Sequence, residues 1–509
     1  MRFESSVKNT IASIVMQLVT MMIGLILPRF YLTAYGSEIN GLVSSIIQFI
    51  SYFTLVEAGL ASAATASLYI PLSQKDTSKV NHILAAARNF YYKIGFIFSG
   101  LVIGLAVTYP LFVKTKSLSP FDIGLLVLIL GFSGAFDFFT LSKYRVLLTA
   151  DQKYYIVANA STIANIVNFL LVFVSIQLSF GIIFVRAVAL TSFILRSLIL
   201  NIYVRHHYKF VSYSVVPDNS ALNKRWDAMV LQLLGLAQTA MPVIMLTLFA
   251  SDLKVVSIYS IYNMAASSIL AVLSSLTNGF AASFGDMLAR KESETIKKAY
   301  SQYEVLFFSL MTCSYSCMNI LYISFIRLYT SGITDINYVN PLIAILFVIN
   351  GIAFNIKTPA GTLIGAAGIF KETKAATILQ TAIAIIAAAI LTPLWGIQGV
   401  LVALIISNLY RDIDLIIYMA KHVTGIPCMK TFYRIFRYLL LFVIINLPFY
   451  FIKLTPSGFL MWLVQGVVVL ICCAVFVGLF NFVFEREVFL SILIRVRYFG
   501  NILKGRKKD

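Results

Sequence analysis

The sequence predicts an all-α integral membrane protein with about 14 transmembrane helices. Of its 509 residues, 60% are apolar and only 12% are charged, about half the roughly 25% of a soluble globular protein. A chain of this length with so few charges has too little polar surface for soluble domains. Composition therefore excludes a disordered chain, a disulfide-stabilised secreted scaffold and a conventional soluble enzyme.

Fourteen segments are long and apolar enough to cross a bilayer, which takes about 20 mostly apolar residues. The second and eighth are long, so we expect them to bend or to extend beyond the bilayer, whereas the thirteenth is short. In order, the segments are 11–32, 39–70, 91–113, 121–141, 155–178, 181–203, 229–250, 255–287, 303–329, 341–365, 375–394, 396–419, 438–452 and 458–480.

The distribution of Lys and Arg predicts how these helices are oriented. With a cytoplasmic N-terminus, 33 of the 40 Lys and Arg residues fall inside and seven outside. Arg145, after the fourth segment, and Arg434, after the twelfth, are among the inside loop residues. Membrane proteins concentrate these residues in cytoplasmic loops. We therefore predict cytoplasmic N- and C-termini, and we attribute the net charge of +19 to orientation rather than to nucleic-acid binding.

The chain resembles itself at a shift of about 216 residues. Pro120 and Pro341 each open the fourth helix of a half, and His207 and His422 each close the sixth. Two sets of six helices in the same orientation are parallel repeats, which transporters use to hold a substrate site near the bilayer midplane.

This repeat predicts the domain organisation. Two additional helices follow the repeat, and the chain ends in a basic amphipathic cytoplasmic tail, which anionic lipids of the inner leaflet would hold. The predicted parts are an N-lobe at 1–210, a C-lobe at 211–425, additional helices at 426–482 and the tail at 483–509.

Two carboxylates lie deep in predicted spans. Glu57 is near the middle of the second helix, and Asp137 lies toward the inner side of the fourth. A charge in a membrane span is costly and usually faces protein or a water-filled cavity. These acids either form structural ion pairs with arginines or couple transport to H⁺ or Na⁺.

Four cations in the spans are candidate substrate ligands. They are Arg29, Arg186, Arg196 and Lys357, of which Lys357 falls near the repeat position of Asp137. Guanidinium groups suit phosphate because their fork donates two parallel hydrogen bonds. Near Lys357, Pro359 permits a kink. We expect Arg411, Asp412 and Asp414 to form a solvated inner rim of the twelfth helix.

The sequence gives no sign of an enzyme. It has no nucleophile–His–acid arrangement, no metal-ligand cluster and no phosphate-binding glycine loop, and its five cysteines lie mostly in apolar runs. We therefore expect no catalytic residues, no metal and no cofactor beyond a coupling ion.

Three stretches resemble the multidrug/oligosaccharidyl-lipid/polysaccharide (MOP) exporter superfamily. The first runs from Pro28-Arg29-Phe30 to Asn40-Gly41-Leu42, the second is Glu57-Ala58-Gly59-Leu60 with the small residues after it, and the third is the basic loop at 71–79. Within the superfamily, the chain resembles the Wzx-like polysaccharide transporters, which flip undecaprenyl-diphosphate-linked oligosaccharides.

The resemblance implies a MATE-like, V-shaped pair of six-helix lobes, a central cationic lumen and alternating access. It also implies that Arg29 matches a lumen arginine and Glu57 the acid of the second helix. Arg186 and Arg196 rest on their depth alone. Fourteen helices fit the lipid-linked-sugar branches better than the twelve-helix drug exporters.

These inferences predict a monomeric flippase of the bacterial plasma membrane whose substrate is a polyprenyl-diphosphate-linked glycan. One alternative is a cation-coupled multidrug exporter, which would favour lumen acids over arginines. A second is a membrane glycan polymerase, for which we would expect a large outside loop with catalytic residues.

Overall fold

A computed structural model of the chain describes residues 2–57, 60–218, 225–250, 252–290, 292–452, 454–491 and 494. The described residues form helices and connecting turns without a β-strand, which confirms the predicted all-α class. The chain divides into two compact units. Unit 1 contains residues 1–260 and 332–336, and unit 2 contains residues 261–331 and 337–509.

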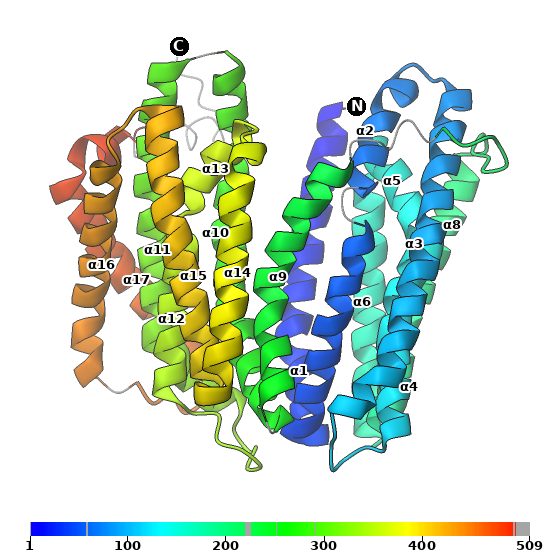
Figure 1. Ribbon diagram of the computed structural model, residues 1–509, viewed down its shortest axis with the longest axis horizontal. Helices are drawn as coiled ribbons and strands as arrows, with labels where there is room; N and C mark the ends of the chain where they lie inside the picture. Colours follow the sequence, from blue (N-terminus) through cyan, green and yellow to red (C-terminus); the bar gives the residue numbers. More distant parts are fainter. Residues whose placement is uncertain are drawn as a thin grey trace. The chain divides into compact units, whose positions relative to one another are not determined.

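Unit 1 consists of the helices drawn from blue to green in Figure 1. They are α1 (Arg2–Phe53), α2 (Leu60–Ser73), α3 (Thr77–Phe112), α4 (Pro120–Phe136), α5 (Ser142–Ala150), α6 (Tyr154–Gln177), α7 (Ile182–Ala189), α8 (Thr191–His207), α9 (Arg225–Phe249) and the first residues of α10 (Leu253–Ala289). Within the unit, α1 packs along α6 and α9, α3 packs along α4, and α6 packs along α8.

The long helix α1 carries the first predicted span and the beginning of the second. Gly36 interrupts its helical backbone with a φ of 79°, a conformation that glycine adopts because it has no Cβ. After Phe53 a single 3₁₀ turn covers Thr54–Glu57, and α2 begins at Leu60. The predicted span 39–70 is therefore broken beside Glu57, as its length suggested.

Unit 2 contains the rest of α10 and the later helices. They are α11 (Ser293–Tyr329), α12 (Pro341–Ile356), α13 (Thr358–Ala366), α14 (Phe370–Trp395), α15 (Ile397–Met419), α16 (Cys428–Phe451) and α17 (Phe459–Phe484). Here α15 packs along α14 and α12, while α11 contacts α12, α16 and α17.

The thirteenth predicted span begins earlier in the structure. Helix α16 starts at Cys428, ten residues before the predicted start, so Arg434 and Arg437 lie on a helix rather than in a loop. Arg434 is only 2% exposed because it pairs with Glu304 of α11 and with Glu485. The positive charge of Arg434 made the residues before Tyr438 resemble a loop in the sequence. In the structure, Glu304 and Glu485 neutralise that charge.

The helices match those of a polytopic membrane protein. Eleven described helices are long and apolar enough to cross a membrane, and each predicted span lies on one described helix or on two consecutive ones. Helix α9, 25 residues long, carries the seventh predicted span. On α17, Leu460 and Val483 are 78% and 69% exposed, as expected for side chains that face lipid.

Two sequence-based predictions remain predictions. They are the lobe limits at residues 210 and 425 and the cytoplasmic position of both termini. The predicted basic tail, 483–509, falls largely outside the described residues, which end with 454–491 and 494.

Candidate functional site

Glu57 and Asp137, the two predicted acids, lie in one ion-pair network within unit 1. The Arg145 Nη2 atom donates to Glu57 Oε1 at 2.9 Å, and its Nη1 atom lies 3.7 Å from Asp137 Oδ2. Arg196 donates to the other oxygen of Asp137 at 2.8 Å. The structure thus brings together three of the predicted site residues and adds Arg145, which sequence reasoning assigned to a loop.

A π-helical turn carries Arg145 to Asp137. Residues Asp137–Leu141 are π-helical between α4 and α5, and the Ser142 N–H bonds to the Asp137 carbonyl. In a regular α-helix, residue i+8 is rotated by roughly 80° from residue i, since each residue turns about 100°. A π turn inserts one extra residue, so Arg145 approximates position i+7 and shares the face of Asp137.

The network is partly buried and has no net charge. Glu57 and Asp137 are each 19% exposed, Arg196 is 27% exposed and Arg145 is 37% exposed. Two guanidinium groups balance two carboxylates, so the network can connect four segments of unit 1 as a structural element. The same guanidinium groups can exchange a carboxylate for a phosphate, which offers them similar bidentate bonds.

Replacing Arg145 with methionine is expected to lower the free energy of unfolding by about 1.5–3 kcal/mol, since a charge-assisted bond is lost and Glu57 loses its partner. The double variant Glu57→Gln/Arg145→Met should regain most of this stability, because glutamine carries no charge that needs a partner. Thermal melting of the purified variants measures both effects. A double variant as unstable as Arg145→Met would show that the ion pair is not what Arg145 contributes.

Arg186, on α7, has a different environment from the network. Its guanidinium lies 3.9 Å from the centre of the Tyr31 ring, on α1. Among the described residues no carboxylate pairs with it, and its Nε atom is buried without a hydrogen-bond partner. The Tyr31 hydroxyl is also buried without a partner. The Arg186 Nε atom and the Tyr31 hydroxyl are thus two neighbouring donors without partners. Arg29, which is half-buried, precedes Tyr31 by two residues on α1.

Lys357 lies in unit 2, at the break between α12 and α13. Pro359 lies in the first turn of α13, and the interruption at Lys357 matches the predicted kink. The Lys357 Nζ atom donates to Asn408 Oδ1 at 2.6 Å, and Asn408 also bonds with Asn350 and Gln380. Lys357 thus belongs to a polar cluster of its own unit, and its role as a substrate ligand stays a prediction.

The solvated rim predicted for the twelfth helix is wrong for two of its three residues. Arg411 is 6% exposed and Asp412 is 4% exposed. Arg411 pairs with Asp414 and donates to Thr377 Oγ1 of α14 at 2.9 Å. Because α14 packs along α15, it covers the side that the sequence pattern left open to solvent.

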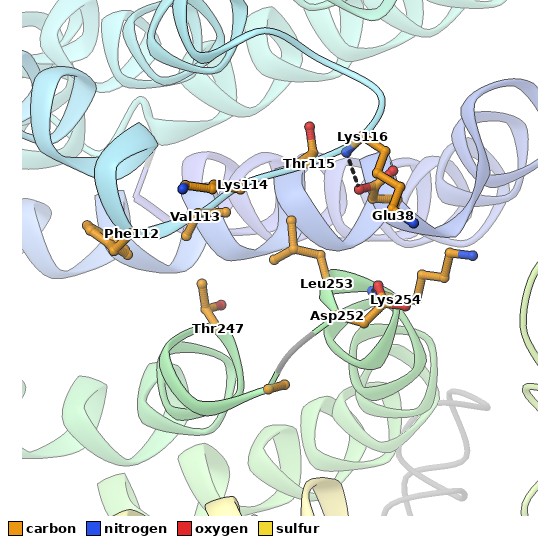
Figure 2. Close-up of a pocket in the computed structure, with 11 residues that line it drawn as sticks. Glu38, Phe112, Val113, Lys114, Thr115, Lys116, Thr247, Asp252, Leu253 and Lys254 are labelled. Atoms are coloured by element: carbon orange, nitrogen blue, oxygen red, sulfur yellow. Dashed lines mark hydrogen bonds between the residues drawn. The ribbon is translucent and has the colours of Figure 1, made fainter.

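A cavity of about 620 Å³ lies in unit 1 between the α3–α4 connection and the start of α10 (Figure 2). Glu38 lies at its edge and accepts hydrogen bonds from the Lys116 N–H at 2.8 Å and from the Ser117 hydroxyl. Lys114 and Lys254 also line the cavity. Its described lining includes none of the predicted site residues. The α3–α4 connection and the connection between α9 and α10 are both predicted to lie on the outer side of the membrane.

Sequence reasoning missed Arg145 and the burial of Asp412. The spacing of eight residues between Asp137 and Arg145 places the two side chains on one helix face only because a π turn lies between them, and the sequence pattern does not reveal that turn. Among the described residues, no group of three His, Cys, Asp or Glu side chains is placed to hold a metal ion. The absence of a cofactor remains an expectation from the sequence.

No protein-family model and no curated protein sequence matches the chain. Solved structures do share its fold. The lipid II flippase MurJ, in an inward closed conformation, has a TM-score of 0.67 at 17% identity, covering 94% of this chain and 100% of that one. An inward-facing MATE multidrug resistance transporter of the MOP superfamily has a TM-score of 0.63 at 13% identity, covering 84% and 99%.

A third similar structure is a MOP superfamily transporter from Pyrococcus furiosus, with a TM-score of 0.55 at 13% identity, covering 86% of this chain and 97% of that one. Similarity at such low identity concerns the backbone and not the ligand. The chain therefore has the fold that MATE transporters and the MurJ flippase share within the MOP superfamily.

Proposed function

We propose that this protein is a flippase that moves a polyprenyl-diphosphate-linked oligosaccharide across the bacterial plasma membrane by alternating access. The observation that carries this proposal is Arg186. Among the described residues, it is a partly buried guanidinium without a carboxylate partner, and it lies beside the unpartnered Tyr31 hydroxyl. A buried donor without a partner carries a free-energy cost, which an entering anion would relieve.

The chemistry of a diphosphate fits these donors. A diphosphate carries about two negative charges, and its oxygens must leave water to enter a transporter, which is tolerable only if protein donors replace the hydration. The fork of Arg186 can bind two oxygens at once, and the Tyr31 hydroxyl can donate to a third. Arg29, proposed as a further ligand from the sequence, lies two residues from Tyr31 on α1 and therefore on a different face of that helix. The fold agrees, because a lipid II flippase shares it.

Glu57 and Asp137 are proposed to couple the cycle to H⁺ or Na⁺. Their arginine partners, Arg145 and Arg196, would compete with any coupling cation while the network is intact. Coupling therefore requires that the network open during transport. The double variant Glu57→Gln/Arg145→Met keeps Asp137 as a coupling acid, so its transport should respond less than wild type to a pH or sodium gradient. An unchanged response would exclude Glu57 as a coupling group.

A cation-coupled multidrug exporter is the alternative, since MATE transporters share the fold. Such a site needs a carboxylate that an organic cation can reach. In this chain, arginine binds both Glu57 and Asp137, whereas no carboxylate pairs with Arg186 among the described residues. Asp412, whose carboxylate oxygens have no hydrogen-bond partner among the described residues, is only 4% exposed. The charge pattern therefore favours an anionic substrate.

The proposed cellular setting follows from the same reasoning. The protein would act as a monomer in the plasma membrane, with both termini in the cytoplasm and the basic tail held by anionic lipids. Neither nucleic acid nor a cofactor has a role in this proposal.

Replacing Arg186 with alanine should weaken binding of a prenyl-diphosphate analogue by at least about tenfold, since charge-assisted bonds contribute roughly 1.5–3 kcal/mol. Arg186→Lys should be partly defective, because lysine keeps the charge but loses the fork. Titration of the analogue into purified full-length protein measures both affinities.

The matched control is Arg290→Ala. Arg290 is 66% exposed and, among the described residues, pairs only with Asp286, four residues earlier, so its loss should leave affinity unchanged. Wild-type affinity of Arg186→Ala for the analogue, with Arg290→Ala also unchanged, would refute the role of Arg186 and favour the drug-exporter alternative.

A further inference from the structure

A second group of cations lies where α3 begins and α8 ends, at the side of unit 1 that is predicted to be cytoplasmic. Arg88 of α3 and Lys143 of α5 approach the same two tyrosine rings. The Arg88 Cζ atom lies 5.7 Å from the centre of the Tyr92 ring and 5.3 Å from that of Tyr213. For the Lys143 Nζ atom, these distances are 6.0 and 5.5 Å. Arg205, near the end of α8, adds a third positive charge close to Lys143.

The connection that follows α8 holds Tyr213 in this position. The Asn81 side chain, in the first turns of α3, donates to the Phe210 carbonyl at 2.9 Å and accepts from the Ser212 N–H at 3.1 Å. His82, the next residue, contacts the Val216 carbonyl through its ring at 2.5 Å. The segment around Tyr213 is therefore attached to α3 on both sides of the tyrosine.

The positive charge in this group has no carboxylate partner in the part of the chain that the structure describes. Among the described residues, no carboxylate pairs with Arg88, Lys143 or Arg205. The Arg88 Nε atom and the Tyr213 hydroxyl are both buried without a hydrogen-bond partner. Burial among neighbouring tyrosines raises the pKa of Tyr213, so its hydroxyl keeps its proton and remains a donor.

The tyrosine rings do not satisfy these groups. The distances of 5.3–6.0 Å, and the 5.0 Å from the Lys143 Nζ atom to the centre of the Tyr144 ring, lie within the limit of about 6 Å for a cation–π contact, which contributes only roughly 0.5–2 kcal/mol. A ring attracts a cation over its face but leaves the in-plane N–H of a guanidinium without an acceptor. Two cations on the same pair of rings also repel each other. An anion would remove both penalties.

We infer that Arg88, Lys143 and Tyr213 form a binding site for a phosphate-type anion, either a phosphate or a diphosphate group, at the predicted cytoplasmic end of unit 1. A guanidinium binds two phosphate oxygens through its fork, a lysine ammonium acts as a point charge, and a phenol donates one further bond. This site is separate from Arg186 in the sequence and in its partners. Its binding of an anion does not depend on transport.

Two sources can supply this anion. One is the headgroup of a membrane lipid, which reaches the ends of helices that cross the bilayer. The other is a soluble phosphate compound of the cytoplasm. Both sources present the same phosphate chemistry, but only the lipid also carries an apolar chain. The test therefore compares a diphosphate with and without such a chain.

The experiment is a calorimetric titration of inorganic diphosphate into the purified full-length protein. Wild type should bind saturably, and Arg88→Gln and Lys143→Gln should each bind at least about tenfold more weakly, as expected for a lost charge-assisted bond. Tyr213→Phe keeps the ring and loses only the hydroxyl, so it should fold normally and bind about two- to fivefold more weakly.

Two controls keep this result separate from the proposed function. Lys79→Gln removes an exposed lysine of the same helix, 71% exposed, and should bind as wild type does. Arg186→Ala removes the diphosphate ligand of the proposed function, so the binding of inorganic diphosphate that remains in this variant belongs to the Arg88–Lys143–Tyr213 site. If Arg186→Ala loses the binding while Arg88→Gln and Lys143→Gln keep it, the inference is wrong and the role of Arg186 stands.

A second titration, with a short-chain prenyl diphosphate, identifies the source. Tighter binding than inorganic diphosphate, lost in Arg88→Gln, indicates a lipid headgroup, and equal binding indicates a soluble anion. Either result supports an anion site. Wild type that fails to bind both compounds, or variants that bind both as wild type does, would overturn the inference.

Discussion

Replacing Arg434 with alanine should lower the free energy of unfolding by about 3–5 kcal/mol, the cost of removing one partner of a buried ion pair. Arg434 and Glu304 are 2% and 3% exposed, and the two side chains lie 2.5 Å apart. Arg434 also donates twice to Glu485, at 3.0 Å each. Its loss would leave Glu304 as a buried charge without a cation and would loosen α16 from α11.

Arg437 provides the matched control, since it is on the same helix and binds the same Glu485 at 2.7 Å. It is 32% exposed, so Arg437→Ala should lower the free energy of unfolding by less than about 1 kcal/mol. Thermal melting of both purified variants gives the comparison. Equal losses would show that burial of the Arg434 pair does not determine its contribution.

Replacing Gly41 with alanine should also strongly destabilise the protein. A Cβ at this position would lie 1.9 Å from the Leu253 carbonyl oxygen and 2.8 Å from its carbon. These are backbone atoms, which cannot rotate away as a side chain can. The neighbouring bond from Asn40 to the Ser257 hydroxyl, at 2.7 Å, holds α1 against α10 and would be strained. We expect a loss of about 1–3 kcal/mol or more from the overpacking.

Gly24 is the control for Gly41, because it lies on the same helix and a Cβ there would meet nothing within 4 Å. Alanine favours a helix over glycine by roughly 0.5–1 kcal/mol, so Gly24→Ala should be neutral or slightly stabilising. The two substitutions are chemically identical and should have effects of opposite sign. Melting temperatures test this, and a Gly41→Ala protein as stable as Gly24→Ala would refute the close approach of α1 and α10.

The helices were predictable because apolar length is a property of the sequence itself. Each predicted span lies on one described helix or on two consecutive ones, and the break beside Glu57 matches the length of the second span. The depth of a charge was also informative, since Glu57, Asp137 and Arg196 are brought together. Depth does not identify partners, however, because these come from helices that are distant in the sequence.

Charges at the ends of apolar segments were the main source of error. Arg145, Arg411 and Arg434 all follow an apolar run, and a hydropathy pattern cannot distinguish such residues from a solvated loop. In the structure each lies on a helix and pairs with a carboxylate. The π turn after Asp137 moved one of them onto the face of its partner. These pairings depend on tertiary packing, which no local pattern contains.

The central claim is that the protein translocates a lipid diphosphate. The most direct test reconstitutes the wild-type chain in liposomes with a fluorescent polyprenyl-diphosphate oligosaccharide and measures how much label becomes accessible from the opposite leaflet. We expect translocation that requires the protein and that unlabelled prenyl diphosphate inhibits, whereas a lipophilic organic cation does not inhibit it. Protein-dependent efflux of the organic cation, without translocation of the lipid diphosphate, would contradict this expectation.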